Sequence, residues 1–292
     1  MLNKVLVTGA SGLLGSKLMS FLSKENEVTP THSLNLFDSS SIRMNITERE
    51  VVLRTLDTVR SKVVIHAAAM TNVDNCETNR ELAWRINALG AKNVAEGCAR
   101  IGARLVHIST DYVFDGQKGS YVEADKTHPI NYYGLTKLKG EEFAMKLCPD
   151  SIIIRTSVLY GWHPTKPNFA TWVVDSLRKR KPIDVATDQY CSPTLADDLA
   201  RIICGTVAGN RYGIYHASGA ERVSRYDFAL RIAEVFRLDT SLIRPAKMAD
   251  LKAWVARRPV DSSLCVQKLQ KDFRIEPLDM TEALQKMMET EK

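Results

Sequence analysis

A tyrosine and a lysine in this chain are spaced to do acid/base chemistry together. Tyr133 precedes Lys137 by four residues at the start of a predicted helix, and one helical turn brings such a pair onto the same face. A free tyrosine has a pKa of about 10, and a neighbouring ammonium favours the phenolate, which brings the group toward the range for proton transfer. Tyr132 lies about 500° around the helix from Lys137, off that face. Taken alone, the pair is equally well interpreted as an aromatic ring beside a solvated charge, so its context has to decide.

A glycine-rich turn lies between the first predicted strand, residues 4–8, and an amphipathic helix, residues 16–26. Gly9 permits a tight turn, Gly12 lets backbone amides approach a pyrophosphate at the helix N-terminus, and Gly15 lets helix and strand pack closely. A glycine turn in this position, opening the first helix of the chain, predicts a dinucleotide site.

The end of the second predicted strand, residues 27–32, bears on the choice of cofactor. Proteins that prefer NAD tend to carry a carboxylate there for the ribose 2′-hydroxyl, but the local sequence, residues 31–35, contains none. NADP(H) is therefore favoured and NAD(H) is an alternative. His32, Ser33 and Arg43 are the candidate partners of a 2′-phosphate.

Two further strands end in residues that could face a ligand. The strand 63–66 runs into Ala67, Ala68 and Ala69, which fit either a backbone that passes close to a ligand or a tightly packed strand end. The strand 104–108 opens toward Thr110, whose hydroxyl lies where parallel sheets bind ligands. A turn or capping role is the usual explanation for a single threonine.

The predicted fold is α/β, a doubly wound parallel sheet of the Rossmann type with a smaller, mostly helical C-terminal substrate domain. Helices are expected at residues 48–60, 79–101 and 169–180, with further strands at 151–155 and 213–217. From residue 221 the chain is predicted to form helices and loops. The expected domains are a dinucleotide-binding domain at 1–160, to which 189–220 returns, and a substrate-binding domain at 161–188 and 221–292.

Two loops are predicted to contact a substrate. Residues 161–168 are rich in turn formers and aromatics, a composition typical of recognition segments. Arg257 and Arg258 precede a proline and could hold a diphosphate. Paired arginines are also common on protein surfaces, so both interpretations stay open.

The composition is that of a soluble globular protein of 292 residues with a formal charge of +6. The basic residues are scattered, so nucleic acid is not indicated. The six cysteines form no CxxC pair and the six histidines no HExxH motif, so neither a zinc site nor a redox pair is predicted. No charged and apolar leader and no long apolar run is present. We expect a cytoplasmic protein without a membrane segment.

The chain resembles the extended short-chain dehydrogenase/reductases and, among them, the dTDP-4-dehydrorhamnose reductase family. The matching segments, in chain order, are the turn Thr8 to Gly15, HAAAMTNVDNCE at 66–77, STDYVFDG at 109–116, the Tyr133 and Lys137 pair, DQYCSPT at 188–194 and RRPVDSSL at 257–264. One such motif is weak evidence, but six in the right order predict the family.

The resemblance implies reduction of the 4-keto group of a nucleotide-activated deoxysugar, with dTDP-4-dehydro-L-rhamnose as the expected substrate. Tyr133 would donate the proton, Lys137 would hold the nicotinamide ribose and lower the pKa of Tyr133, and Thr110 would hydrogen-bond the carbonyl oxygen.

The remaining implied contacts fall into two sets. The cofactor set, besides Tyr133 and Lys137, is Gly9, Ser11, Gly12, Leu13, Leu14, His32, Ser33, Asn45, Ala67, Ala68 and Ala69. The substrate set is Thr71, Val73, Asp111, Trp162, Asn168 and Arg258.

The chain departs from the family at two positions. Val158 stands where many members carry a tryptophan that faces the sugar, and Trp162 is a candidate substitute. Lys17 stands where members that bind magnesium at a dimer interface use a glutamate, so no metal is predicted. A homodimer is compatible with the sequence, which does not fix the oligomeric state.

Two other functions remain open. One is an NDP-sugar epimerase or dehydratase of the same superfamily. The other is a non-catalytic subunit like the regulatory β-subunit of methionine adenosyltransferase, which would not require Thr110, Tyr133 and Lys137 to be present together.

Overall fold

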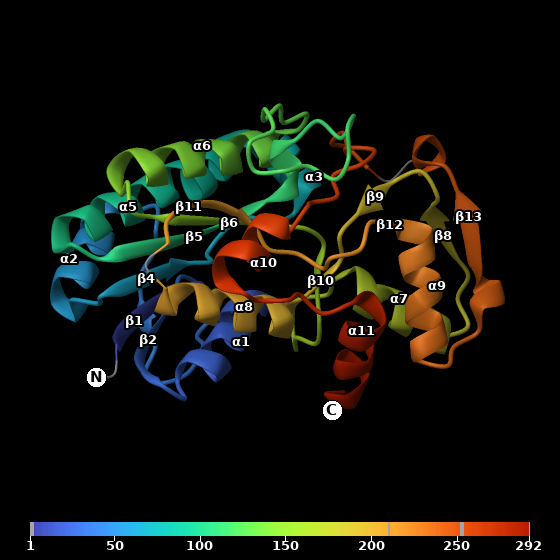
Figure 1. The fold of residues 1–292 in the computed structure, drawn as a ribbon, viewed down its shortest axis with the longest axis horizontal. Coiled ribbons are helices and arrows are strands. Elements are labelled where there is room, and N and C mark those ends of the chain that lie inside the picture. The colour runs from blue at the N-terminus through green and yellow to red at the C-terminus, as the bar shows by residue number, and fades with distance from the viewer. Residues whose placement is uncertain (1–2, 210, 252–253, 292) are drawn as a thin grey trace.

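A parallel seven-stranded sheet forms the centre of the larger lobe in the computed structural model, which describes residues 3–209, 211–251 and 254–291 (Figure 1). The strand order is β11-β6-β5-β4-β1-β2-β3, and every neighbouring pair is parallel. The strands are β1 (Asn3–Thr8), β2 (Asn26–His32), β3 (Ile42–Arg43), β4 (Val63–His66), β5 (Arg104–Thr110), β6 (Ile152–Thr156) and β11 (Gly213–His216). The predicted doubly wound sheet is confirmed, and the short edge strand β3 is an addition to it.

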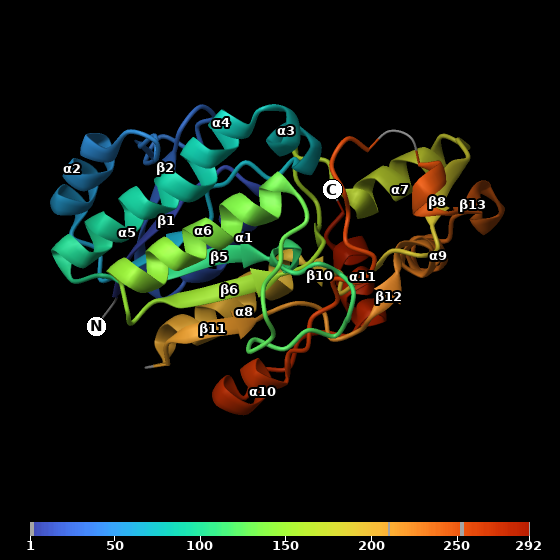
Figure 2. The same cartoon turned by 90° about the horizontal axis from the view of Figure 1, so that it is seen from above.

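Helices cover both faces of this sheet. On one face α1 packs against α8, and on the other α5 packs between α2 and α6 (Figures 1 and 2). Their bounds are α1 (Leu13–Leu22), α2 (Arg49–Val59), α5 (Gly90–Ile101), α6 (Tyr132–Leu147) and α8 (Ala196–Ala208). Because both faces are covered, the strands can be apolar throughout, as in KVLVT and SIIIR.

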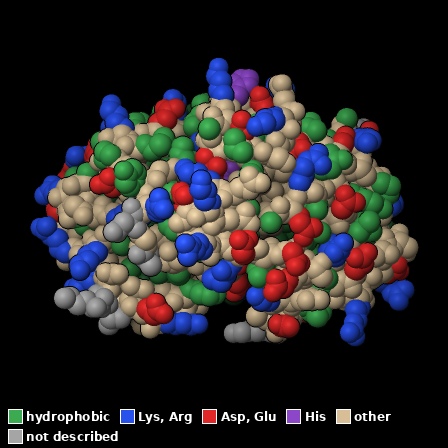
Figure 3. All heavy atoms as spheres, in the orientation of Figure 1, with side chains coloured by type: hydrophobic (Ala, Val, Ile, Leu, Met, Phe, Trp, Pro, Cys, Tyr) green, Lys and Arg blue, Asp and Glu red, His purple; other side chains and the backbone are tan. Residues whose placement is uncertain are grey.

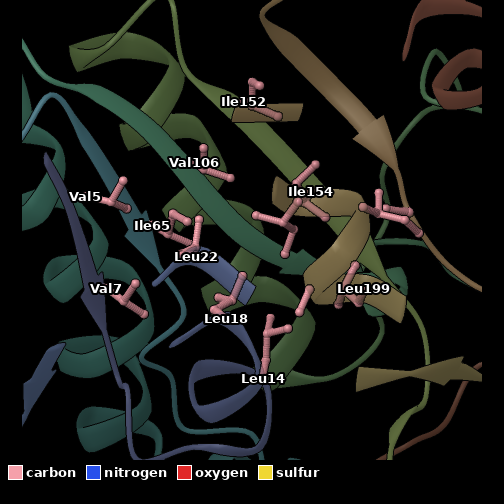
Figure 4. Close-up of a cluster of buried hydrophobic side chains, with 14 of the residues drawn as sticks. Val5, Val7, Leu14, Leu18, Leu22, Ile65, Val106, Ile152, Ile154 and Leu199 are labelled. Atoms are coloured by element: carbon pink, nitrogen blue, oxygen red, sulfur yellow. The ribbon is translucent and has the colours of Figure 1, made fainter. Parts of the chain in front are cut away.

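The core on the α1 face shows how the sequence pattern becomes packing (Figure 4). Leu14, Leu18 and Leu22 recur at helical spacing on α1 and point at the sheet. Ile65 and Ile154, from β4 and β6, meet them and are fully buried. This contact fixes α1, and with it the glycine turn at its start, over the carboxyl ends of the strands.

The chain reverses its direction of travel across the sheet between β1 and β4. From β1 it proceeds to β2 and β3, and then returns to β4 on the other side of β1. Ligands of such sheets bind at this switch point, at the carboxyl ends of the strands. Every strand of the sheet is parallel, so the residues that follow β1, β4, β5 and β6 meet at this one edge.

The smaller lobe has its own core and contains more strand than predicted. Helices α7 (Phe169–Arg178), α9 (Arg225–Val235) and α11 (Met280–Glu289) bury one hydrophobic cluster. Three two-stranded sheets accompany them, so the expectation of helices and loops alone after residue 221 was wrong. They pair β7 (Leu159–Tyr160) with β10 (Thr194–Leu195), β8 (Ile183–Ala186) with β13 (Ile243–Ala246), and β9 (Tyr190–Cys191) with β12 (Val223–Ser224).

The helix predicted over 79–101 is interrupted. It consists of α4 (Arg80–Ala83), a π-helical turn (Trp84–Leu89) and α5, and it follows the short helix α3 (Val73–Thr78). Asn87 lies in the π-helical turn, where its side chain accepts a hydrogen bond from the Met70 backbone and donates to the Met70 carbonyl and to Thr136. A π-helical turn inserts one residue into the helical repeat, and this one orients Asn87 toward the segment after β4 and toward α6.

The last part of the chain joins both lobes. Helix α10 (Gln267–Phe273) packs against β11, and its Leu269 lies in the core of the sheet. Three 3-10 turns, Asp111–Val113, Thr240–Leu242 and Met248–Asp250, complete the elements.

Acidic and basic side chains are interspersed on the face seen in Figure 3. Within the described residues, no helix is both long enough and apolar enough to cross a bilayer.

Replacing Gly15 with alanine tests the packing of α1. A Cβ at this position would collide with the Gly9 carbonyl and would lie 2.8 Å from the Ala10 Cα. We expect Gly15→Ala to lower the free energy of unfolding by about 2 kcal/mol, measured by urea denaturation, because backbone atoms must shift. The exposed Ser20→Ala on the same helix is the control and should change stability by less than about 0.5 kcal/mol. A Gly15→Ala protein as stable as the wild type would contradict the close approach.

Candidate active site

The glycine turn lies at the switch point and requires glycine for two distinct reasons. Gly9 has a φ of +70°, and a Cβ on it would lie 2.9 Å from the Ala68 Cα. Gly15 carries no side chain because the Gly9 carbonyl occupies that space. The close packing of Ala68 against Gly9 supports the tightly packed interpretation of the alanines after β4.

The N-terminus of α1 suits an anion. Gly12 is the N-cap and no side chain caps this end of the helix, so the amides of Leu13 and Leu14 are open to a ligand. The described residues thus fit the pyrophosphate of a dinucleotide, which these amides would hold.

The first turn of α6 is fixed from three sides, and this positions Tyr133. Asn131 caps the helix by accepting from the Gly134 amide at 2.8 Å, and its side-chain amide donates to the Arg257 carbonyl at 2.9 Å. The Tyr132 amide donates to Glu77 at 2.9 Å. The Tyr132 ring faces away and stacks on the Arg80 guanidinium, 5.2 Å from the ring centroid. Tyr133, and not Tyr132, therefore faces the strand ends.

Tyr133 lies beside the end of β5, and its ring meets that of Tyr112 edge-on at 6.0 Å. Part of the Tyr133 ring is exposed, but its hydroxyl is desolvated, and this desolvation raises the pKa of Tyr133 above its ordinary value. The Thr110 side chain acts in the opposite direction on the pKa, so Thr110 and Tyr133 are close neighbours. The phenol is thus protonated at neutral pH, which is the state that a proton donor requires.

Lys137 is buried on the same face of α6, 3% exposed. Its ammonium donates to the Ile108 carbonyl at 2.6 Å, and desolvation lowers the pKa of Lys137 to about 8. The lowering of the Tyr133 pKa expected from Lys137 does not prevail: desolvation dominates that pKa and raises it, and the Lys137 ammonium donates to the β5 backbone.

Thr110 ends β5 and also begins the 3-10 turn after it. Its hydroxyl accepts from the Tyr112 amide at 3.2 Å and donates to Asp111 at 2.9 Å. The capping role left open for Thr110 is therefore present, and the hydroxyl is held next to Tyr133 by the same contacts.

Asp111 is buried and joins three segments. Besides Thr110, its carboxylate accepts from Ser157 at 2.8 Å and from Ser262. Desolvation raises the pKa of Asp111, and these hydrogen bonds oppose that effect. These hydrogen bonds connect the ends of β5 and β6 to the C-terminal segment. Asp111 therefore holds the segments around the site in place.

The other expected substrate contacts differ in their exposure and in the contacts that they make within the protein. Thr71 is exposed and Val73 begins α3, close to Asp74, which binds Arg258 at 2.8 Å. The Trp162 indole donates to the Met287 carbonyl at 2.7 Å, and its ring packs on Phe236 in the core of the smaller lobe.

Asn168 caps α7 and donates to the Gly161 carbonyl. The structure thus gives Trp162 and Asn168 packing and capping contacts in place of the open positions expected of them. Val158, at the position of the family tryptophan, has a φ of +42°, which is unusual for a β-branched residue.

The residues expected around the adenosine end lie together at the edge of the sheet. His32 ends β2, pairs in register with Arg43 on β3, and shares a 2.7 Å hydrogen bond with Ser41. Ser33 and Arg43 are exposed. The Asn45 side chain accepts from Thr47 and donates to Glu48 in the turn before α2.

A buried ion pair beneath the site was missed in the sequence. Glu141, one turn after Lys137, pairs with Arg155 of β6 at 2.7 Å. The signal was available: Glu141 follows Lys137 at helical spacing, and Arg155 is a single charge in an apolar strand. Lys17, by contrast, was noted, and it pairs with Asp197 at 3.0 Å, joining α1 to α8.

Fold and site together define the class of protein. A doubly wound parallel sheet, a glycine turn at the switch point, and a tyrosine one helical turn before a buried lysine are the features of an extended short-chain dehydrogenase/reductase. Within that class, the chain belongs to the dTDP-4-dehydrorhamnose reductase family: the family described as RmlD substrate binding domain matches residues 3–292.

Two reductases and one protein of another name are among the relatives of this chain. A dTDP-4-dehydrorhamnose reductase of Aggregatibacter actinomycetemcomitans is 35% identical over 96% of this chain and 97% of its own length. The crystal structure of a dTDP-4-dehydrorhamnose reductase of Bacillus anthracis in complex with NADP superposes with a TM-score of 0.91, at 32% identity over the whole of both chains. The mouse methionine adenosyltransferase 2 subunit beta is 31% identical over 91% of this chain and 81% of its own length.

The stability of the protein in acid tests the environment of His66, which ends β4. Its ring shares a 2.7 Å hydrogen bond with Thr8, and burial lowers the pKa of His66 to about 3. Between these pH values the unfolded chain binds a proton at His66 that the folded protein does not, so the contribution of His66 to stability is full above pH 6.5 and is lost as the pH falls toward 3.

We expect His66→Gln to reduce this loss, measured as the slope of the urea unfolding free energy against pH. The exposed His128→Gln is the matched control. An unchanged slope in His66→Gln would show that His66 does not titrate as its burial requires.

Proposed function

We propose that this protein reduces the 4-keto group of a nucleotide-activated 6-deoxysugar with NADPH, and that its substrate is dTDP-4-dehydro-L-rhamnose, which becomes dTDP-L-rhamnose. The observation that carries the proposal is the placement of Tyr133, Lys137 and Thr110 at one edge of the sheet beside the glycine turn. Membership of the reductase family and the relatives' activities support the substrate.

The three side chains have separate tasks in this reaction. A bound reduced nicotinamide supplies the hydride. Tyr133, whose phenol is neutral at physiological pH, gives its proton to the ketone oxygen. Thr110 would turn its hydroxyl hydrogen from Asp111 to that oxygen and so stabilise the charge that develops on it in the transition state. Lys137 holds the nicotinamide ribose and stabilises the phenolate that remains.

The cofactor proposed is NADP(H), with NAD(H) as the alternative. No carboxylate lies at the end of β2 within residues 31–35, and His32, followed by Ser33, pairs with Arg43 at the strand ends where a 2′-phosphate would bind. The NADP complex of the Bacillus anthracis reductase supports the same choice. The other proposed cofactor contacts are Gly9, Ser11, Gly12, Leu13, Leu14, Asn45, Ala67, Ala68 and Ala69.

On the substrate side, Thr71, Val73 and Arg258 are proposed to contact the nucleotide sugar. Asp111, Trp162 and Asn168 are proposed to support that surface, because their polar atoms are engaged within the protein. The proposal includes a cytoplasmic location, with neither membrane nor nucleic acid as partner, and a homodimer remains compatible with it.

The two lobes are proposed to divide these tasks. Residues 1–160 and 189–220 would bind the dinucleotide, since β11 completes the large sheet. Residues 161–188 and most of 221–292 would bind the substrate, since α7, α9 and α11 share a separate core. Helix α10 is the exception, because it packs on the sheet.

The experiment that tests the proposal measures NADPH and NADH oxidation with dTDP-4-keto-6-deoxyglucose, with and without the 3,5-epimerase that forms the L-rhamno ketone. We expect NADPH oxidation that depends on the epimerase. Protein purified with bound NAD that interconverts sugars without consuming NADPH would support an epimerase instead. A non-catalytic subunit, the other function left open by the sequence, would leave NADPH unoxidised with either sugar.

Replacing Tyr133 with phenylalanine tests the proton donor. The change removes one hydroxyl and keeps the ring that packs on Tyr112, so the protein should fold normally. We expect kcat to fall roughly 10²- to 10⁴-fold, measured by NADPH oxidation. Tyr132→Phe is the matched control, because that ring faces Arg80, and it should keep kcat within a few-fold of wild type. Equal activity of the two variants would remove Tyr133 from the mechanism.

Replacing Arg43 with alanine tests the choice of nicotinamide cofactor. The loss of a charged partner of the 2′-phosphate should raise the KM for NADPH roughly 10-fold or more, whereas the KM for NADH, which has no 2′-phosphate, should stay constant. Steady-state kinetics with the two cofactors give the ratio directly, and NADH serves as the internal control. If the KM values for NADPH and NADH rose together, Arg43 would not be a specific partner of the 2′-phosphate.

A further inference from the structure

The ion pair of Glu141 and Arg155 lies directly behind the site and is sealed from water. The Glu141 side chain is fully buried and that of Arg155 is 3% exposed. Arg155 donates through Nε at 3.0 Å and through Nη2 at 2.7 Å, and the Ser109 hydroxyl donates to the same carboxylate. The Glu141 carboxylate is thus fixed by side chains of β5 and β6 while its own helix, α6, carries Lys137 and Tyr133.

Stability alone is a weak reason for such a pair. Removing two charges from water costs about as much as their attraction returns, and well-packed apolar residues often serve as well. The location of the pair is more informative. Glu141 follows Lys137 by one helical turn, so the two side chains share one face of α6, and Glu141 raises the pKa of Lys137 against the effect of burial.

The other titratable groups that face Lys137 supply no negative charge at neutral pH. Burial raises the pKa of Cys76 to about 11 and lowers that of His66 to about 3. It raises the pKa of Tyr133 and lowers that of His107. These groups come from α3, β4, α6 and β5, and each is neutral. Among these described neighbours, the Glu141 carboxylate is the charge that opposes the desolvation of the ammonium.

We propose that Glu141 is a positioning residue that keeps Lys137 charged inside the closed site, and that Arg155 and Ser109 hold its carboxylate in place for this purpose. The proposal rests on the proposed function, in which a charged Lys137 binds the nicotinamide ribose and stabilises the Tyr133 phenolate. Without Glu141, Lys137 loses its proton at a lower pH, and the reductase loses activity on the alkaline side.

The test follows Lys137 through protein stability, so it does not depend on turnover. The folded pKa of Lys137, about 8, lies below its ordinary value of 10.5. Between these values the unfolded chain binds the proton and the folded protein does not, so the contribution of Lys137 to stability rises with pH from about 8. Urea unfolding is measured from pH 6 to 10.5 for the wild type and for each Glu141 variant, with and without Lys137→Met. The difference in unfolding free energy between each such pair isolates this rise.

We expect the rise to begin about one pH unit lower in Glu141→Gln. Because that variant leaves Arg155 buried without its partner, the double variant Glu141→Gln/Arg155→Gln is measured beside it and should show the same direction of shift. Glu142→Gln is the matched control: this neighbouring carboxylate pairs with Lys139 at the surface, and its loss should leave the onset at the wild-type pH.

An onset unchanged from wild type in the double variant would overturn the proposal and leave the ion pair a purely structural link between α6 and β6. Should the charge-removing variants fail to fold, Glu141→Asp decides, since drawing the carboxylate back must shift the onset partway and an unmoved onset counts against the proposal. The alkaline limb of the rate of NADPH oxidation should move with the onset. A protein that shows the stability shift but no reductase activity would refute the proposed function and not the role of Glu141.

Discussion

Desolvation of one turn of α6 is the constraint on which the rest of the site depends. Tyr133 and Lys137 meet the end of β5, where Lys137 is buried and Tyr133 is partly buried, and desolvation moves their pKa values in opposite directions. The phenol keeps its proton, while the ammonium needs help to stay charged. The fixed negative charge of Glu141, held by Arg155, is what opposes the effect of burial on the lysine.

The remaining architecture holds that turn in place. Asn131 caps α6 and also contacts the segment before Arg258, so the helix start depends on the C-terminal part of the chain. Asp111 likewise connects Thr110 to the C-terminal part of the chain, because its carboxylate accepts hydrogen bonds from Thr110, Ser157 and Ser262. Two buried polar junctions therefore connect the sheet to residues 257–262.

Local sequence signals predicted most of the features that depend on residues close together in the chain. The turn Gly9 to Gly15, the apolar strands and the helix of Tyr133 follow from spacing and residue type, and the structure contains them. The errors concern contacts between distant segments. The interruption around Asn87, the packing of Trp162 on Phe236 and the direction of the Tyr133 pKa depend on which residues the fold brings together, and no short window of sequence contains that information.

The fate of the cofactor hydride tests the central claim most directly. With NADPH deuterated at the transferred position of C4, and with the 3,5-epimerase present, the account predicts one deuterium at C4 of the deoxysugar product for each NADPH consumed, as seen by NMR and mass spectrometry. Product that carries no deuterium at C4, or sugar conversion without net consumption of NADPH, would contradict it.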